Sequence, residues 1–323
     1  MKIVQIKPSN YLVFVNEGET VLDAAIRQGF DFPYSCRSAT CATCMGKVLS
    51  GSINYGDIEP YALDDDEQKD GLALFCSVHP ETDLVIEIED VYGPEYQPIR
   101  SCDYQVDSQQ LLADNLHQVI LSPVTDKKIR FTAGQYLNVI TDENIPVPFS
   151  IANAPNDEGK IELHIHDADD FQYTKEIIGK ITSKSHLKLR GPYGKMVLQP
   201  QPDLPIIFIA GGTGFVPFKA MVEDMIAKGF EREIHIYWRA KSTERLYLKT
   251  MCEQWAQQDK ITFHGLTDGA VYDAVLNDFS DLANYQVFAS GPPEMVYAAK
   301  KVLVANGLNP FFIYSDAFEC FPE

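Results

Sequence analysis

The chain has 323 residues, of which 45% are apolar and 11% aromatic, so it is long enough to fold into two or three domains with their own cores. Its formal net charge of -19 argues against nucleic acid or an anionic membrane as a partner, because binding phosphate groups requires lysine and arginine on one face. The first residues lack the apolar stretch of a secretory signal, and no run approaches the roughly 18 apolar residues of a membrane span. We therefore expect a cytoplasmic protein.

The first 92 residues predict a small mixed α/β domain. Apolar residues that alternate with polar ones predict strands at 2–6, 11–15, 46–51 and 83–91. After the second strand, Thr20 is positioned to cap a helix that ends at Gly29. A short helix is also expected in the acidic run before the last strand.

Acidic residues are concentrated in this first segment. It holds 16 acidic and 6 basic residues, so more than half of the excess negative charge lies in less than a third of the chain. The densest part runs from Asp57 to Asp90 and includes DDDE at 64–67. Two interpretations stay open: a solvated surface with carboxylates in the first turn of a helix, or a docking face for a basic partner.

Four of the seven cysteines have the spacing of an iron-sulfur site. Three of them, at 36, 41 and 44, follow the pattern C-x4-C-x2-C, and Cys76 stands 32 positions later. This is the arrangement by which four thiolates hold a two-iron cluster, whereas zinc sites usually pair two short C-x-x-C knuckles or combine cysteine with histidine. We predict a [2Fe-2S] cluster on Cys36, Cys41, Cys44 and Cys76, with structural zinc or free thiols as the alternatives. The others, Cys102, Cys252 and Cys320, fit no such spacing.

The middle of the chain predicts a small antiparallel barrel. Residues 93–98, with two prolines and a glycine, are expected to be a linker. In the following segment, 99–203, strands are expected at 115–124, 135–141, 160–166, 186–191 and 194–199, and a helix only at 173–181. Several short strands at this spacing are typical of a barrel. His164 and His166 share one face of a strand without further metal ligands, so packing is the role expected for them.

The last segment, 204–323, alternates between strands and helices. Strands are predicted at 205–210, 233–238, 261–266, 285–290 and 310–318, and helices at 216–229, 245–258, 270–279 and 292–307. This alternation indicates a doubly wound parallel sheet.

Three motifs follow strands of this sheet. They are GGTG (Gly211, Gly212, Thr213 and Gly214), SGPP beginning at Ser290, Gly291 and Pro292, and DAF from Asp316 to Phe318. Ligands of such sheets bind at the carboxyl ends of the strands, and amides at a helix start can hold a pyrophosphate. The glycines alone would also suit tight turns, but three motifs on one edge favour a dinucleotide pocket.

Basic residues follow the second strand of the predicted sheet. Arg239, Lys241 and Arg245 occupy the region in which a carboxylate for a ribose hydroxyl is expected in such a sheet. They favour acceptance of a 2′-phosphate, although a basic helix start without a ligand is an equal alternative, so NADH and NADPH both stay open.

Residues 1–92 resemble a plant-type [2Fe-2S] ferredoxin domain, with GETVLDAA, YSCRSATCATC and Cys76 as the matching stretches. The resemblance implies a β-grasp fold. The family carries glycine in the cluster loop where this chain has Ala39 and Ala42. Alanine in a left-handed conformation costs about 1 kcal/mol per position, so we expect the cluster to be retained with an altered potential or stability.

Residues 99–323 resemble the ferredoxin–NADP reductase superfamily, through FTAGQYLNV and PFSIAN. In the motif R-x-Y/F-S of that family, Phe149 and Ser150 match, but Val147 replaces the arginine that binds the flavin phosphate. DADDFQYT at 167–174 replaces the glycine-rich loop of the phosphate cradle, and Asp169 and Asp170 bring negative charge there.

The stretch from Phe149 to Ile181 is similar to bacterial NAD(P)H:flavin reductases, which hold the flavin ring more than the phosphate. This resemblance assigns flavin binding to Phe149, Ser150, Ile151, Ile165 and His166, with FAD, or FMN, held loosely. It also implies catalytic roles at the reacting rings for Ser150, Phe318 and Ser290.

NAD(P)H gives two electrons at once and a [2Fe-2S] cluster accepts one, so a flavin is needed between them. The leading hypothesis is an NAD(P)H-dependent reductase that passes electrons through flavin and cluster to a partner protein. The domain order resembles oxygenase reductases and the reductase that serves CDP-6-deoxy-hexose dehydratase. The alternatives are a free-flavin reductase and a non-catalytic adaptor that uses the acidic face.

Overall fold

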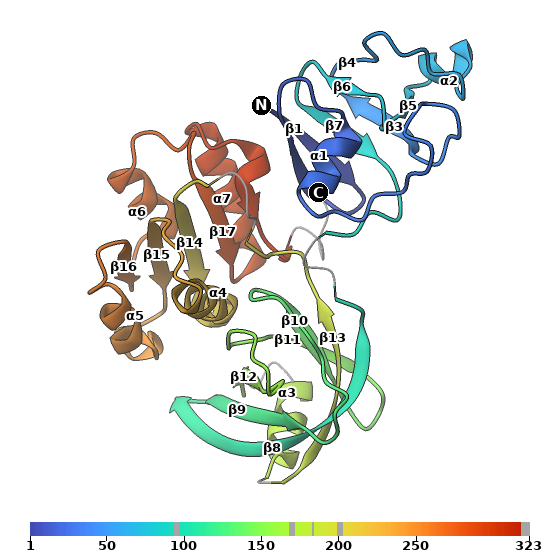
Figure 1. Cartoon of the computed structure of the whole chain (residues 1–323). Helices are drawn as coiled ribbons and strands as arrows, with labels where there is room; N and C mark the ends of the chain where they lie inside the picture. Colours follow the sequence, from blue (N-terminus) through green and yellow to red (C-terminus); the bar gives the residue numbers. More distant parts are fainter. Residues whose placement is uncertain (94–96, 168–171, 183, 199–202, 318–323) are drawn as a thin grey trace. The chain divides into compact units, whose positions relative to one another are not determined.

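The computed structural model describes residues 1–93, 97–167, 172–182, 184–198 and 203–317 (Figure 1). Contacts divide the chain into two compact units, Met1–Tyr96 and Gln97–Glu323. None of the helices in the described part of the chain is long and apolar enough to cross a membrane.

The first unit is a mixed five-stranded sheet with the strand order β2-β1-β7-β3-β5. Its strands are β1 (Lys2–Lys7), β2 (Tyr11–Val15), β3 (Met45–Ser50), β5 (Leu72–Leu74) and β7 (Leu84–Glu87), and β4 (Ile53–Asn54) pairs with β6 (His79–Pro80) beside it. β1 is parallel to β7 and antiparallel to β2, as expected for a β-grasp fold.

The two helices of this unit are short and begin at side-chain caps. Thr20 caps α1 (Val21–Arg27) by accepting a 3.0 Å hydrogen bond from the Asp23 amide, and Gly29 follows the helix with φ of 80°. Helix α2 (Asp65–Lys69) starts with a capping box between Asp64 and Glu67. The apolar residues of α1 pack into the core of the sheet, whereas α2 has no buried residue and presents its carboxylates to solvent.

The second unit begins with a six-stranded antiparallel sheet of order β11-β10-β13-β8-β9-β12. The strands are β8 (Arg100–Ala113), β9 (Leu116–Pro123), β10 (Tyr136–Ile140), β11 (Pro146–Ser150), β12 (Ile161–His166) and β13 (His186–Tyr193), with helix α3 (Gln172–Lys180) before β13. An isolated antiparallel bridge between Ile151 and Leu163 brings the ends of the sheet together, which closes the predicted barrel.

Two strands of the barrel were missed by sequence reasoning, and one expected strand is absent. β8 carries a run of exposed polar residues, and β11 contains Pro146 and Pro148, which are tolerated because β11 is the first strand in the order. The expected strand at 194–199 is wrong over its described part, because residues 194–198 form no ladder and Met196 instead packs into the core of the parallel sheet.

The rest of this unit is a parallel sheet of order β16-β15-β14-β17-β18. Its strands are β14 (Ile206–Gly211), β15 (Ile234–Arg239), β16 (Ile261–Leu266), β17 (Gln286–Ser290) and β18 (Ile313–Tyr314). The helical segments are η1 (Gly212–Phe215), α4 (Val216–Ala227), η2 (Thr243–Arg245), α5 (Lys249–Trp255), α6 (Val271–Asp278), α7 (Pro293–Ala305) and η3 (Pro310–Phe312). Together with the barrel and the mixed sheet, this architecture confirms the predicted fold class.

Helices cover both faces of the parallel sheet. On one face, strand residues such as Phe208 and Trp238 pack with Phe218 of α4 and Cys252 of α5. On the other face lie α6 and α7 (Figure 1), and the Tyr237 hydroxyl donates a 2.6 Å hydrogen bond to Asp278 of α6. GGTG stands at the end of β14, Arg239 at the end of β15 and Ser290 at the end of β17, so these predicted residues share the carboxyl edge of the sheet.

Candidate functional site

The cysteine loop has the backbone conformation that a cluster requires. Arg37, Ala39 and Ala42 all have positive φ, between 56° and 57°. This left-handed turn directs amides toward sulfur: the amides of Ser38 and Thr40 each donate a 3.4 Å hydrogen bond to Sγ of Cys36. Amides aimed at sulfur stabilise thiolates, which are the form that binds iron, so the loop fits a [2Fe-2S] cluster despite the missing glycines.

The four thiols divide into an inner and an outer pair. Cys44 and Cys76 are buried, and the Cys76 amide donates a 3.4 Å hydrogen bond to Sγ of Cys44. Burial raises the pKa of Cys44 to about 12, a penalty that iron removes by neutralising the thiolate. Hydrogen bonds from the Thr40 hydroxyl and from the loop amides lower the pKa of Cys36 to about 5, and Cys41 is exposed. Since Cys36 is half-buried, the outer pair lies nearer to the protein surface than the inner pair.

A cavity of about 690 Å³ in the second unit lies between the barrel and the parallel sheet. This volume is within the range of pockets that hold cofactors. The barrel contributes Phe149 and Ser150 of β11 and two histidines of β12, and the sheet contributes the motifs after β14, β15 and β17. The pocket thus joins a barrel wall to the edge that was predicted to bind a dinucleotide.

Two glycine motifs at this edge touch each other. A Cβ atom added to Gly214 would overlap the carbonyl oxygen of Ser290, and one added to Gly291 would lie 2.9 Å from Cα of Gly211. Only glycine permits this approach, because any side chain would separate the two loops. Gly212, with φ of 57°, starts the turn into η1, and its carbonyl accepts a 2.8 Å hydrogen bond from Trp238.

Strand β11 presents alternate residues to the core and to the pocket. Val147 is buried in the barrel core, where an arginine side chain could not be accommodated without a partner. Ser150 is half-buried and lines the pocket together with Pro148 and Phe149. The position that the superfamily motif gives to a phosphate-binding arginine is therefore part of the hydrophobic packing in this chain.

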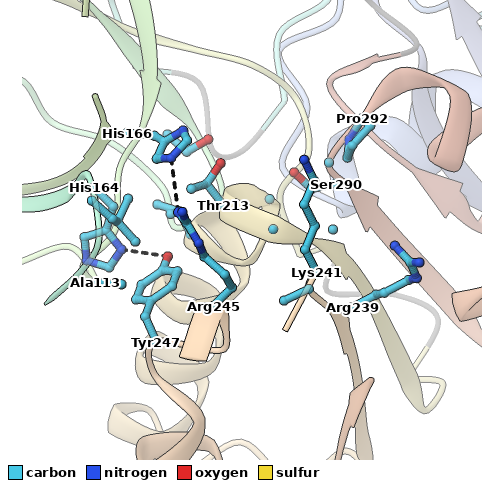
Figure 2. A pocket seen from close by; sticks show the side chains of 18 of the residues that line it. Ala113, His164, His166, Thr213, Arg239, Lys241, Arg245, Tyr247, Ser290 and Pro292 are labelled. Atoms are coloured by element: carbon cyan, nitrogen blue, oxygen red, sulfur yellow. Dashed lines mark hydrogen bonds between the residues drawn. The ribbon is translucent and has the colours of Figure 1, made fainter. Parts of the chain in front are cut away.

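A buried polar network connects β12 of the barrel to the parallel-sheet half. Lys219 of α4 contacts Glu162 at 3.1 Å and donates a 2.9 Å hydrogen bond to the Ala152 carbonyl. Glu162 also lies 2.7 Å from Nε2 of His164, whose Nδ1 shares a 3.1 Å hydrogen bond with the Tyr247 hydroxyl (Figure 2). Burial alone would raise the pKa of Glu162, but the His164 hydrogen bond and the Lys219 charge hold it at about 2. The carboxylate is therefore charged at neutral pH.

The cations of the pocket are spread along it. Figure 2 shows Arg239 and Arg245 on opposite sides, with Lys241 between them. Arg239 donates a 2.7 Å hydrogen bond to the Gly269 carbonyl after β16, whereas Arg245 lies 3.4 Å from Nε2 of His166 on the barrel. Burial and the charges of Arg245 and Lys241 lower the pKa of His166.

The pocket brings together most residues that the sequence assigns to the flavin and the nucleotide, namely Phe149, Ser150, His166, Gly211, Gly212, Thr213, Gly214, Arg239, Ser290, Gly291 and Pro292. Ile151 and Ile165 lie in the barrel core, since alternate strand residues face opposite sides. Asp316 and Tyr136 both lie beside Gly194. A Cβ atom added to Gly194 would be 2.9 Å from Oδ1 of Asp316 and 3.0 Å from the ring of Tyr136. Phe318, Asp169, Asp170 and Cys320 lie outside the described residues.

Several lining residues had no cofactor role assigned from the sequence, namely Ala113, Leu116, Pro148, His164, Val216, Ala240, Tyr247 and Met295. His164 carried a signal, because it shares a strand face with His166. Tyr247 gave none, since it reaches His164 only through the packing of segments 83 residues apart.

Comparisons with known proteins agree with this architecture. The 2Fe-2S iron-sulfur cluster binding domain matches residues 4–81, the oxidoreductase FAD-binding domain matches 103–198, and the oxidoreductase NAD-binding domain matches 208–301. A loop for a two-iron cluster, a flavin barrel and a nucleotide sheet define an NAD(P)H-dependent electron-transfer oxidoreductase with [2Fe-2S], FAD and NAD(P)H as cofactors.

Full-length relatives identify the family. The chain is 32% identical to CDP-6-deoxy-L-threo-D-glycero-4-hexulose-3-dehydrase reductase of Yersinia pestis, over 98% of both chains. It is 30% identical to phenol hydroxylase P5 protein of Acinetobacter pittii, over 98% of this chain and 94% of that protein. The crystal structure of Amycolatopsis cytochrome P450 reductase GcoB matches with a TM-score of 0.64 and 25% identity over 98% of both chains. The chain belongs to this family of iron-sulfur flavoprotein reductases, and the hypothesis of a non-catalytic adaptor is set aside.

Proposed function

We propose that this reductase delivers the electrons of NAD(P)H to a separate oxygenase or dehydratase component that docks over the cluster loop. A bound flavin would supply the conversion between the two-electron donor NAD(P)H and the one-electron acceptor [2Fe-2S]. The observation that carries the proposal is the division of the thiols, because Cys41 is exposed and Cys36 half-buried while Cys44 and Cys76 are buried. A cluster held by these four cysteines would be accessible to a protein acceptor from the side of Cys41.

The surface beside the loop supports docking. The Ala62 amide donates a 3.1 Å hydrogen bond to the Ala39 carbonyl, so the segment before α2 adjoins the cluster loop. Tyr61 in that segment is 75% exposed, and Asp65 and Asp66 of α2 are exposed beyond it. An exposed aromatic side chain beside carboxylates suits a partner with a basic contact surface.

In the pocket, we assign positioning roles to two serines. Ser150 at the end of β11 and Ser290 at the end of β17 both line the cavity, one from the barrel and one from the nucleotide edge. We propose that their hydroxyl groups hydrogen-bond the reacting edges of the flavin and the nicotinamide. Gly214 and Gly291 keep the nucleotide loops close enough for backbone amides to reach the pyrophosphate.

The proposal is tested with cytochrome c, a basic protein, as acceptor. The double substitution Asp65→Lys and Asp66→Lys should slow cytochrome c reduction at least about tenfold at low salt, and the difference should shrink as salt screens the charges. The matched control is the double substitution Glu253→Lys and Asp259→Lys, which makes the same change of charge at two exposed positions of the second unit. Equal slowing by both pairs would contradict docking on α2.

A free-flavin reductase is the second candidate, favoured by the burial of Val147 in the barrel core. The substitution Cys41→Ser separates the two functions because it disrupts only the cluster. If Cys41→Ser no longer reduces cytochrome c with NAD(P)H when no FMN is added, the reductase proposal is supported. Unchanged reduction through released flavin would support the free-flavin reductase.

A further inference from the structure

We propose that Arg245, on the nucleotide side of the pocket, holds the phosphate group of the flavin. The inference rests on the proposed function in one respect, namely that the flavin ring lies against Phe149 and Ser150. A flavin phosphate needs a cation or a set of amides that face it. Among the described residues that line the pocket, the arginine and lysine side chains all come from the parallel-sheet half: Arg239, Lys241 and Arg245.

The register of the barrel gives the direction in which the flavin tail can run. Ile151 and Leu163 face each other in an antiparallel bridge, so the same register places His164 beside Ser150 and His166 beside Pro148. His164 and His166 both line the pocket. A ribityl chain that leaves a ring at Ser150 therefore has the β12 wall to follow, and this wall ends at His166.

Arg245 stands at the end of that wall. Its Nη1 lies 3.4 Å from Nε2 of His166 and donates a 3.1 Å hydrogen bond to the Asp114 carbonyl in the turn between β8 and β9. Figure 2 shows its side chain pointing across the pocket toward His166, away from Arg239. The guanidinium is thus fixed against the barrel, although its backbone belongs to η2 of the other half.

The charge of Arg245 is available for an anion. Its contacts within the described part of the chain are a carbonyl group and an imidazole, with no carboxylate among them. Lys241 adds a second positive charge close enough to His166 to affect its titration. The carboxylate of Asp167 also acts on the titration of His166, and its buried Oδ1 atom has no hydrogen-bond partner among the described residues. A phosphate group between Arg245 and Lys241 would meet two cations from one side.

Arg239 is the matched comparison. It is an arginine of the same pocket, but its Nε atom is directed to the Gly269 carbonyl beyond β16, on the outer side of the sheet edge. This position suits the adenosine part of the pyridine nucleotide. The two arginines are therefore assigned to different ligands, Arg245 to the flavin phosphate and Arg239 to the nucleotide.

The test compares flavins with and without phosphate, using the full chain stripped of flavin. Riboflavin, FMN and FAD are titrated into wild-type protein, Arg245→Gln and Arg239→Gln, and binding is followed by quenching of flavin fluorescence. Arg245→Gln should weaken FMN and FAD binding about 10- to 100-fold while riboflavin affinity changes less than about threefold. Arg239→Gln should leave all three flavin affinities within about threefold. Arg245→Lys should recover part of the loss because it keeps the charge.

Three results would overturn the inference. They are equal loss of riboflavin and FMN affinity in Arg245→Gln, wild-type protein that binds FMN no more tightly than riboflavin, and a variant that loses NADPH affinity relative to NADH while its flavin affinities stay unchanged. The last would assign Arg245 to the 2′-phosphate. Tryptophan fluorescence confirms folding, since both tryptophans lie in the second unit. The docking proposal is tested separately, because reversal of charge on α2 should not change flavin affinity.

Discussion

Lys219 of α4 and Glu162 of β12 form a buried ion pair of 3.1 Å that joins the parallel-sheet half of the second unit to the barrel. Their side chains are 7% and 10% exposed, and His164 and Gln118 complete the contacts of the carboxylate. Glu223, on the next turn of α4, contacts the same ammonium group at 2.8 Å. Because the pair lies beside the pocket wall that carries His164, it fixes the strand along which the flavin is proposed to lie.

Substitution of Lys219 by Met should destabilise the second unit by about 3–5 kcal/mol, because it leaves a buried carboxylate without its cation. Urea unfolding followed by tryptophan fluorescence measures the effect in this unit. The control is Lys228→Met, on the same helix, whose side chain is 66% exposed and which pairs with Asp224 at 2.7 Å. That variant should lose less than about 1 kcal/mol. A similar loss of unfolding free energy in both variants would show that the buried ion pair stabilises the unit no more than the exposed one.

The low pKa of Glu162, about 2 against an ordinary 4.5, makes stability depend on pH. As the pH falls, Glu162 is protonated in the unfolded chain before it is protonated in the folded chain. The stability that the charged carboxylate contributes is therefore complete above pH 4.5 and is lost as the pH falls from 4.5 toward 2. At 1.36 kcal/mol per pKa unit, it amounts to roughly 3 kcal/mol. Unfolding measured from pH 6 to pH 3 should therefore show a shallower acid loss in Glu162→Gln than in wild type. Glu143→Gln, at an exposed position of the same unit, should keep the wild-type slope.

Local signals in the sequence predict elements well when the residues that stabilise them are neighbours. Thr20 caps α1 through a contact three residues away, and in the cysteine loop the Ser38 amide donates to Sγ of Cys36 only two residues away. β11 was missed since its two prolines argue against a strand, and only its place at the sheet edge makes them acceptable. The contact between His164 and Tyr247 has no local signal at all, because it arises from the packing of the two halves of the unit.

Substitution of Ala42 by Gly should stabilise the cluster domain. Ala42 has φ of 56°, and relief of this left-handed strain is worth about 1–2 kcal/mol, of which the greater flexibility of unfolded glycine removes about 0.4–1. The net gain of about 0.5–1 kcal/mol is measured as a slower loss of cluster absorbance on heating. Ala39→Gly should be near neutral, because Ala39 is only 1% exposed and its methyl group packs in the core. Equal gains at both positions would contradict this account.

Substitution of Gly214 by Ala should weaken binding of NADH and NADPH alike. The new methyl group would overlap the Ser290 carbonyl and force apart the loops after β14 and β17, at a cost of about 1–3 kcal/mol. Titration of the reduced nucleotides should show a loss of about tenfold or more, with cluster absorbance unchanged. The control is Gly179→Ala in α3, where a Cβ meets no atom within 4 Å and should stabilise the helix slightly. Unchanged nucleotide affinity in Gly214→Ala would mean that the contact between these two loops does not shape the nucleotide site.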